Sequence, residues 1–289
     1  MKKKLPLILL LGCGVLVAIG VYAAMHGRAS DSDSATSARE IHTTASSLNA
    51  DDPGHPSGVN ADKSLNVGMP AATPSQVKDY EGFRVSFNKE NLTPNWVAWE
   101  LLASETEGSV KRESQFWQDT DIEGCPTTYD YSRSGYDRGH LCPAADQKWS
   151  PRAMTDCFSL ANITPQDHNL NTGAWKTLEN KERVWAQRDS ALVIVAGPIY
   201  KKSDKKRIGE SGVRVPGAFF KVLAAPYLDS PRGIAFVYPN MTAPGNMEKY
   251  AMSIRELEQL TGYDFFTDLP RDIQDKMETS ASFREWNRR

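Results

Sequence analysis

The sequence predicts an α+β fold for residues 77–289. Short segments in this range either alternate between apolar and polar residues or are continuously apolar, and both patterns are typical of strands. Longer segments carry apolar residues at helical spacing. The two kinds of segment follow one another without a regular βαβ alternation, which favours α+β over a doubly wound parallel sheet.

The first expected strands are Phe83–Phe87 and Trp96–Leu101, whose period-two alternation predicts one buried face each. The apolar run 191–196 ends at Gly197-Pro198 and predicts a central strand. Residues 219–223 and 234–238 predict two more strands. The helical segments are expected at about residues 173–188, 247–260 and 270–278, with Thr261-Gly262 as the stop of the second.

Composition excludes several classes of protein. Hydrophobic residues make up 40% of the chain and charged residues 24%, so a disordered, collagen-like or polytopic membrane protein is excluded. The net charge of −2 argues neither for nor against a nucleic-acid partner, because binding depends on local patches. The four cysteines form no CxxC pair, which speaks against a structural zinc site. No glycine-rich phosphate loop follows a strand, so nucleotide-dependent chemistry has no support.

Residues 1–25 form a signal anchor or signal peptide. Three lysines, Lys2 to Lys4, precede an apolar run from Leu5 to Met25, long enough to cross a bilayer as a helix. The run is interpreted in three ways: an uncleaved anchor with the lysines in the cytoplasm, a peptide cleaved near Ala23-Ala24, or a lipoprotein signal at Leu10–Cys13. All three predict an exported domain, either held on the membrane or released as a periplasmic or secreted protein.

Residues 26–76 are expected to be a flexible tether rich in serine and threonine. Between Ala29 and Asn60 there are ten Ser or Thr residues and no aromatic residue. Such a stretch cannot bury enough apolar surface to offset the entropy lost on ordering.

Two parts of the domain carry residues suited to catalysis. The first contains Tyr136-Asp137-Arg138-Gly139-His140, where histidine is suited to accept a proton near neutral pH and Gly139 lets a substrate approach closely. In the second, positions 171, 175, 179 and 183 are spaced by four and would form one slowly turning helix face. That face carries Asn171 and Glu179, whose oxygens suit Mg²⁺, and Arg183, which suits a phosphate. The alternatives are a structural histidine and a surface Glu179–Arg183 pair.

The motifs together resemble the DNA/RNA non-specific endonuclease family. The Asp-Arg-Gly-His signature occupies residues 137–140, an Asn-x-x-Pro-Gln element 162–166, and an Asn-x-Gly-Ala-Trp-x-x-Leu-Glu element 171–179. The resemblance implies a ββα-metal (His-Me finger) nuclease with a central, mostly antiparallel sheet flanked by helices. It also implies DNA and RNA as substrates, hydrolysis that leaves 5′-phosphate ends, and Mg²⁺ as cofactor with Mn²⁺ as a possible substitute.

The same resemblance assigns roles to individual residues. His140 would be the general base, and Asn171 the single direct protein ligand of the metal. Glu179 would hold one of the metal's waters, while Arg183 and Arg112 would contact phosphate. Asn162 would orient His140.

Other features leave alternatives open. Lys201–Lys221 carries a net charge of +5, which fits either a phosphate-binding patch or a solvated loop. Cys125, Cys142 and Cys157 could form one disulfide in an exported domain, although a buried apolar role is preferred for Cys142.

A catalytically silent nucleic-acid-binding protein is the alternative function from another class. The intact His140, Asn171 and Glu179 argue against it. A phosphodiesterase acting on small or lipid substrates would be separated by product analysis.

Overall fold

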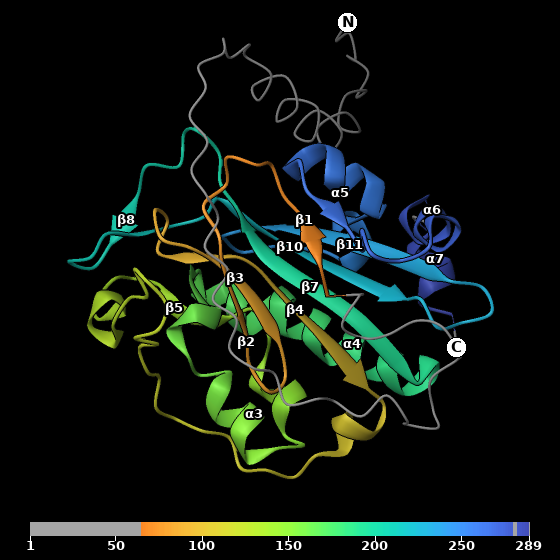
Figure 1. Ribbon diagram of the computed structural model, residues 1–289, viewed down its shortest axis with the longest axis horizontal. Coiled ribbons are helices and arrows are strands. Elements are labelled where there is room, and N and C mark those ends of the chain that lie inside the picture. Colours follow the sequence, from red (N-terminus) through yellow and green to blue (C-terminus); the bar gives the residue numbers. More distant parts are fainter. Residues whose placement is uncertain (1–64, 280–281, 289) are drawn as a thin grey trace, which may run out of the picture. The chain divides into compact units, whose positions relative to one another are not determined.

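A seven-stranded antiparallel sheet is the main element of the computed structural model, which describes residues 65–279 and 282–288 (Figure 1). The strand order is β12-β11-β10-β7-β4-β3-β2. The strands are β2 (Gln76–Asp79), β3 (Arg84–Asn88), β4 (Thr93–Leu102), β7 (Ala191–Ile199), β10 (Ala218–Ala225), β11 (Arg232–Pro239) and β12 (Ala251–Met252). The α+β class and the central antiparallel sheet are therefore confirmed, and each of the five expected strands is present.

Three further strand pairs lie outside this sheet. They are β1 (Val67–Gly68) with β13 (Asp264–Phe265), β5 (Asp137–His140) with β6 (Ile163–Gln166), and β8 (Arg207–Ile208) with β9 (Val213–Arg214). The α-helices of the described residues are α3 (Pro151–Asp156), α4 (Lys176–Asp189), α5 (Ile254–Thr261), α6 (Arg271–Thr279) and α7 (Phe283–Trp286).

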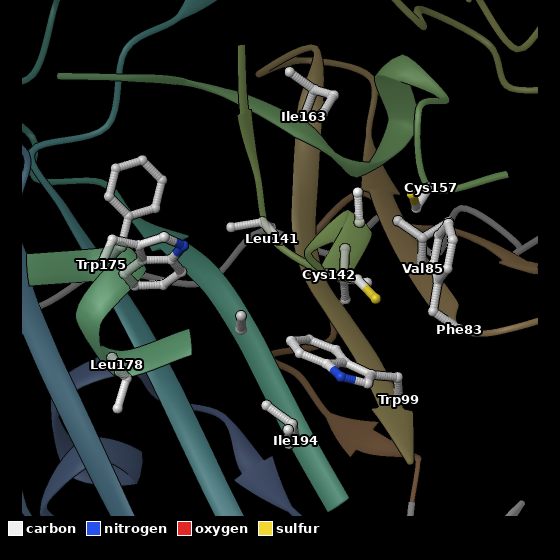
Figure 2. Packing of buried hydrophobic residues seen from close by; sticks show 14 of the residues in the cluster. Phe83, Val85, Trp99, Leu141, Cys142, Cys157, Ile163, Trp175, Leu178 and Ile194 are labelled. Atoms are coloured by element: carbon white, nitrogen blue, oxygen red, sulfur yellow. The ribbon is translucent and has the colours of Figure 1, made fainter. Parts of the chain in front are cut away.

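The central strands are buried on both faces, so the prediction of one buried face was wrong. In β4, Val97 and Trp99 belong to one apolar cluster, whereas Trp96 and Ala98 belong to another. Leu178 of α4 packs in the first cluster, where Figure 2 shows it with Trp99. Helices α5 and α6 contribute to the second cluster, and Figure 1 shows them across the sheet from α4. Alternation reports the strand period, but covering elements far along the chain decide which faces are buried.

Capping explains where the expected second helix begins and ends. Ser253 accepts a hydrogen bond from the backbone N–H of Glu256, whose carboxylate accepts one from Ser253 N–H, so a capping box fixes the start of α5. Gly262 ends the helix in the left-handed region with φ 74°. The expected stop is confirmed. Residues 247–252 form a 3-10 turn and β12 rather than helix.

The folded domain extends upstream of the expected boundary at residue 77. Val67 is buried and pairs with Phe265, and β2 begins at Gln76. Residues 1–64, which include the expected signal and most of the expected tether, lie outside the described residues. Within residues 65–279 and 282–288, no helix combines the length and the apolar character needed to cross a membrane.

A buried ion pair connects α4 to the sheet. Lys221 Nζ of β10 lies 3.0 Å from Glu182 Oε2 of α4, and both side chains are fully buried. The same ammonium lies 4.7 Å from the ring centroid of Trp175 and 5.2 Å from that of Trp99. Opposite charge and two aromatic faces together compensate the desolvation of the lysine.

Removing one member of this pair should be far more costly than removing both. We expect Lys221→Met to lower the free energy of unfolding by about 3–5 kcal/mol, because it leaves an uncompensated buried carboxylate. The double variant Lys221→Met/Glu182→Leu should recover much of that loss. Urea denaturation measures both, and a single variant as stable as the parent would contradict the role given to the pair.

Candidate active site

Two antiparallel strands followed by a helix bring the predicted catalytic residues together. Strand β5 pairs with β6 so that Asp137 lies opposite Gln166 and His140 opposite Ile163. After β6 the chain makes a turn at residues 170–175 and enters α4. The motif residues 137–140 and most of 162–166 are therefore neighbours across one antiparallel ladder. The third motif, residues 171–179, begins in the turn and ends in α4.

Gly139 is required by this strand pair. A Cβ at this position would lie 2.4 Å from Gln166 Oε1 and 2.5 Å from Gln166 Cβ. The residue is also buried. The expectation that Gly139 makes room for a substrate is therefore wrong, because the space that it leaves is filled by the side chain of Gln166.

His140 lies at the end of β5 in an aromatic setting. Its ring centroid lies 4.8 Å from that of Phe158 and 5.3 Å from that of Phe116, and the residue is 8% exposed. Nε2 is buried and has no hydrogen-bond partner among the described residues. Burial, and then the positive charge of Arg112, lowers the pKa of His140 to about 3. The imidazole is therefore neutral at pH 7, with a nitrogen open to accept a proton.

Arg112 lies on the same aromatic ring as His140. Its guanidinium carbon is 5.1 Å from the ring centroid of Phe158, and the side chain is exposed. This position brings a solvent-accessible positive charge close to His140, as a phosphate contact requires.

Asn162 acts on the backbone beyond His140. Its Nδ2 donates to the carbonyl oxygens of Cys142 and Cys157, each at 2.8 Å, and its Oδ1 accepts from Cys142 N–H at 2.9 Å. No hydrogen bond joins Asn162 to His140 in the described part of the chain. Any influence of Asn162 on the imidazole therefore passes through the main chain from Leu141 to Cys142, which it holds in place.

The spacing predicted that Asn171 and Glu179 share one continuous helix, but they do not. It lies in a π-helical turn, Leu170–Trp175, and Gly173 within that turn has non-helical angles, φ −105° and ψ −107°. The regular helix begins only at Lys176. The four-residue spacing therefore places positions 179 and 183 on one face of a helix, but position 171 does not share that face.

A carboxylate on β5 orients Asn171 instead. Asn171 Nδ2 donates to Asp137 Oδ2 at 2.8 Å, and the same oxygen lies 2.9 Å from Nδ1 of the exposed His168. Because the amide nitrogen is held by Asp137, Oδ1 is the end that is left to coordinate a metal. No side chain of the described residues donates to that oxygen.

Glu179 and Arg183 lie on α4 beside the buried ion pair. Burial is the main cause that raises the pKa of Glu179 to about 7, and the positive charge of Lys221 opposes it. Arg183 Nη1 donates to Asp146 Oδ1 at 2.6 Å, and Asp146 is fully buried and also accepts from Trp99 Nε1. The described residues contain no salt bridge between Glu179 and Arg183, so the interpretation as a surface pair was wrong.

The sequence did not indicate the residues that hold the predicted ones in place. Asp137 fell within a recognised motif, yet its contact with Asn171 depends on the turn after β6. Asp146 lies in the segment Pro143-Ala144-Ala145-Asp146, which carries no chemical signature. Only the packing of α4 against the loop after β5 gives Asp146 its contact with Arg183.

The basic stretch 201–221 is less positive on its surface than its composition suggests. Lys221 is buried against Glu182, and Arg214 donates to the carbonyl oxygens of Lys201 and Asp204. Arg207 also donates to backbone carbonyls, but it is exposed and its positive charge stays at the surface. Lys206 is exposed, and its Nζ lies 4.5 Å from the ring centroid of Tyr136, the residue before β5. Of the exposed lysines in this loop, Lys206 thus lies close to the start of the strand that carries His140.

The three cysteines of the described residues take no part in this chemistry. Cys125, Cys142 and Cys157 are free and buried. Burial raises the pKa of the Cys142 thiol well above its usual range, so the thiolate is disfavoured. The burial of Cys142 agrees with the apolar role preferred for it. The three cysteines form no disulfide with one another, so the disulfide alternative was wrong.

The side chains present fit a hard divalent cation. The turn supplies an amide oxygen, Asn171 Oδ1, and α4 supplies the carboxylate of Glu179. Oxygen ligands, few in number, suit Mg²⁺, which keeps several waters. Hydrogen bonding by Asp137 fixes the orientation of the Asn171 amide, as second-shell groups do at metal sites.

Two strands and a helix that present a neutral histidine, an oriented asparagine and a fixed arginine define a ββα-metal nuclease fold. The comparisons agree. The chain belongs to the DNA/RNA non-specific endonuclease family, whose model matches residues 60–272.

Individual relatives are moderately similar. The chain is 32% identical to "Nuclease EXOG, mitochondrial" of Xenopus laevis over 69% of this chain and 61% of the relative. It is 33% identical to "Nuclease" of Nostoc sp. over 69% of this chain and 76% of the relative. A crystal structure of an EndoG/EndoGI complex matches with a TM-score of 0.65 at 27% identity, covering 71% of this chain and 91% of that chain. The match thus spans about three fifths of the mitochondrial EXOG nuclease.

The low pKa of His140 should appear in the pH dependence of stability. Between pH 6.5 and about 3 the unfolded chain binds a proton that folded His140 does not, so stability falls as the pH falls through this window. We expect the parent to lose about 2 kcal/mol more between pH 7 and pH 5 than His140→Gln does. Urea unfolding at the two pH values gives the difference, with His168→Gln as the exposed control. Equal losses in parent and His140→Gln would show that the imidazole is not desolvated.

Proposed function

We propose that this chain is an exported, metal-dependent endonuclease that hydrolyses phosphodiester bonds of DNA and RNA without sequence preference. The observation that carries the proposal is the buried Nε2 of neutral His140, which has no hydrogen-bond partner among the described residues and lies near Arg112 at the end of β5. Family membership supports the reaction class. Sequence preference is slight if the contacts go to phosphates rather than to base edges.

His140 is the proposed general base, which takes a proton from the attacking water. Its pKa of about 3 would make it a weak base on its own. Burial is the main cause of this low pKa, and the guanidinium of Arg112 is the second. A substrate phosphate beside Arg112 would offset the second cause through its negative charge. The base therefore gains strength when substrate is bound.

Arg183 is proposed to stabilise negative charge as it develops on the phosphate. Asp146 and Asn180 already hold its guanidinium, so little reorganisation is needed at the moment of reaction. Asn171 would ligate Mg²⁺, or Mn²⁺ in its place, and Glu179 would hold one of the waters. When bound, the metal neutralises a non-bridging phosphate oxygen and stabilises the leaving 3′ oxygen. The products would carry 5′-phosphate and 3′-hydroxyl ends.

Export is proposed from the first 25 residues alone. The lysines and the apolar run support a domain that acts outside the cytoplasm, either anchored in the membrane or released after cleavage. Immunoblotting of fractionated cells separates the anchored from the released form. Recovery of the full chain in the cytoplasm would contradict export.

Loss of His140 should remove catalysis while the fold remains. We expect His140→Ala to lower kcat for plasmid cleavage by about 10²–10⁴-fold, the range for loss of a general base. Asn171→Ala should require more Mg²⁺ for any remaining activity, and excess EDTA should abolish cleavage by the parent. Lys181→Ala, an exposed change on the same helix, is the control. Parent-like activity in folded His140→Ala would refute the mechanism, and full activity in EDTA would refute the metal.

Salt should report which lysines of the basic loop contact nucleic acid. Each phosphate contact contributes about 0.9 to the slope of log affinity against log salt on B-DNA. We expect Lys205→Ala/Lys206→Ala to reduce that slope by about 1–2, with cleavage-site preference unchanged. Lys276→Ala, on α6, is the control and should leave the slope as it is. An unchanged slope in the double variant would remove the loop from the binding surface.

A further inference from the structure

Three carboxylates gather outside the candidate active site. They are Glu258 of α5, Asp264 of β13 and Glu278 of α6, and one oxygen from each lies within 4.8 Å of the others. Helices α5 and α6 pack in the apolar cluster on the face of the sheet opposite α4. None of the residues assigned above to catalysis takes part in this acidic cluster.

The carboxylate of Glu278 is incompletely satisfied. The residue is 2% exposed, and its Oε2 accepts a hydrogen bond from Arg255 Nη2 at 2.7 Å. Its Oε1 is buried and has no hydrogen-bond partner among the described residues. A buried charged oxygen without a partner is costly, and such atoms commonly indicate a ligand that has not been accounted for.

The charges of the acidic cluster are also out of balance. Among the described residues, Glu278 is the one member of the cluster that forms a salt bridge, and its partner Arg255 also pairs with Asp275 outside the cluster. The oxygens of Glu258, Asp264 and Glu278 lie close enough for their negative charges to repel one another. A cation bound among the three carboxylates would relieve this repulsion, and contact with Oε1 would supply the partner that this oxygen lacks.

We propose that Glu258, Asp264 and Glu278 form a calcium-binding site that stabilises the fold. Ca²⁺ takes six to eight oxygen ligands at about 2.3–2.6 Å, so oxygens on opposite sides of one ion lie about 5 Å apart. Oxygens within 4.8 Å of one another can therefore all reach a single ion. Asp264 is exposed, which leaves the ion access and room for waters. Mg²⁺ sheds its waters reluctantly and is the weaker fit.

The position of Asp264 gives the site a structural consequence. Asp264 pairs with Gly68, and Phe265 with Val67, in the two-stranded ladder of β1 and β13. Phe265 N–H also donates to Glu258 Oε1 at 2.9 Å. An ion held by α5, β13 and α6 therefore fastens β1, the first strand of the described chain, to the rest of the domain.

Thermal unfolding of the full chain tests the site without using activity. With CaCl₂ added at constant ionic strength, the Tm of the parent should rise and saturate, by about 3–5 °C at ten times Kd. The Kd should lie near 10⁻⁴–10⁻³ M, the range of extracellular calcium sites. Asp264→Asn/Glu258→Gln should lose the rise, and MgCl₂ should produce less of it.

Two control variants separate this site from its surroundings. Asp275→Asn removes another carboxylate that pairs with Arg255 but lies outside the acidic cluster, and it should keep the calcium response. Asn171→Ala should also keep it, which would exclude the catalytic metal as the cause. Absence of a rise in the parent, an undiminished rise in the double variant, or loss of the rise in Asn171→Ala would each overturn the proposal.

Discussion

The buried pair of Lys221 and Glu182 is the contact on which the geometry of the active site depends. It is made where α4 crosses β10, and it places a positive charge in an interior that also contains Asp146 and Glu179. Burial raises the pKa of Glu182 and of Glu179, and the charge of Lys221 opposes both shifts. Without that charge, these two carboxylates would be still harder to keep ionised. The aromatic rings of Trp99 and Trp175 pack around the ammonium, so apolar packing and charge balance are satisfied by the same side chain. The pair of Lys221 and Glu182 therefore helps to fix the position of α4, and with it the position of Arg183.

Sequence reasoning predicted the features that local pattern determines. The five long strands were found because apolar runs and alternation are properties of neighbouring residues. The stop at Gly262 was found because a left-handed helix end favours glycine. The candidate site residues came from motifs, and the hairpin-like pairing of β5 with β6 brings two of those motifs together.

The rest depended on contacts between residues far apart in the chain. The partner of Arg183 is Asp146, which precedes it by 37 positions, and no spacing rule predicts such a pair. Gly139 was assigned to substrate access because the opposing residue, Gln166, is not known before the strands are paired. The burial of both sheet faces required α5 and α6, whose docking the strand pattern does not contain. Lys221 was counted in the net charge of the basic stretch, although burial and Glu182 place it in the core.

The interruption at Gly173 divides the active site into two separately supported parts. Asn171 is fixed to strand β5 by Asp137, whereas Arg183 is fixed to the loop after that strand by Asp146 and belongs to the regular helix. Gly173 lies between them with non-helical angles, so Asn171 is not positioned by the regular geometry of α4. Glu179, the proposed ligand of a metal-bound water, lies on α4 with Arg183, whereas Asn171 lies on the turn. Substitutions around the turn are therefore expected to change the proposed contribution of Asn171 to metal affinity more than the position of Arg183. A lineage could change its preferred cation through substitutions around the turn without losing the arginine geometry inherited with the helix.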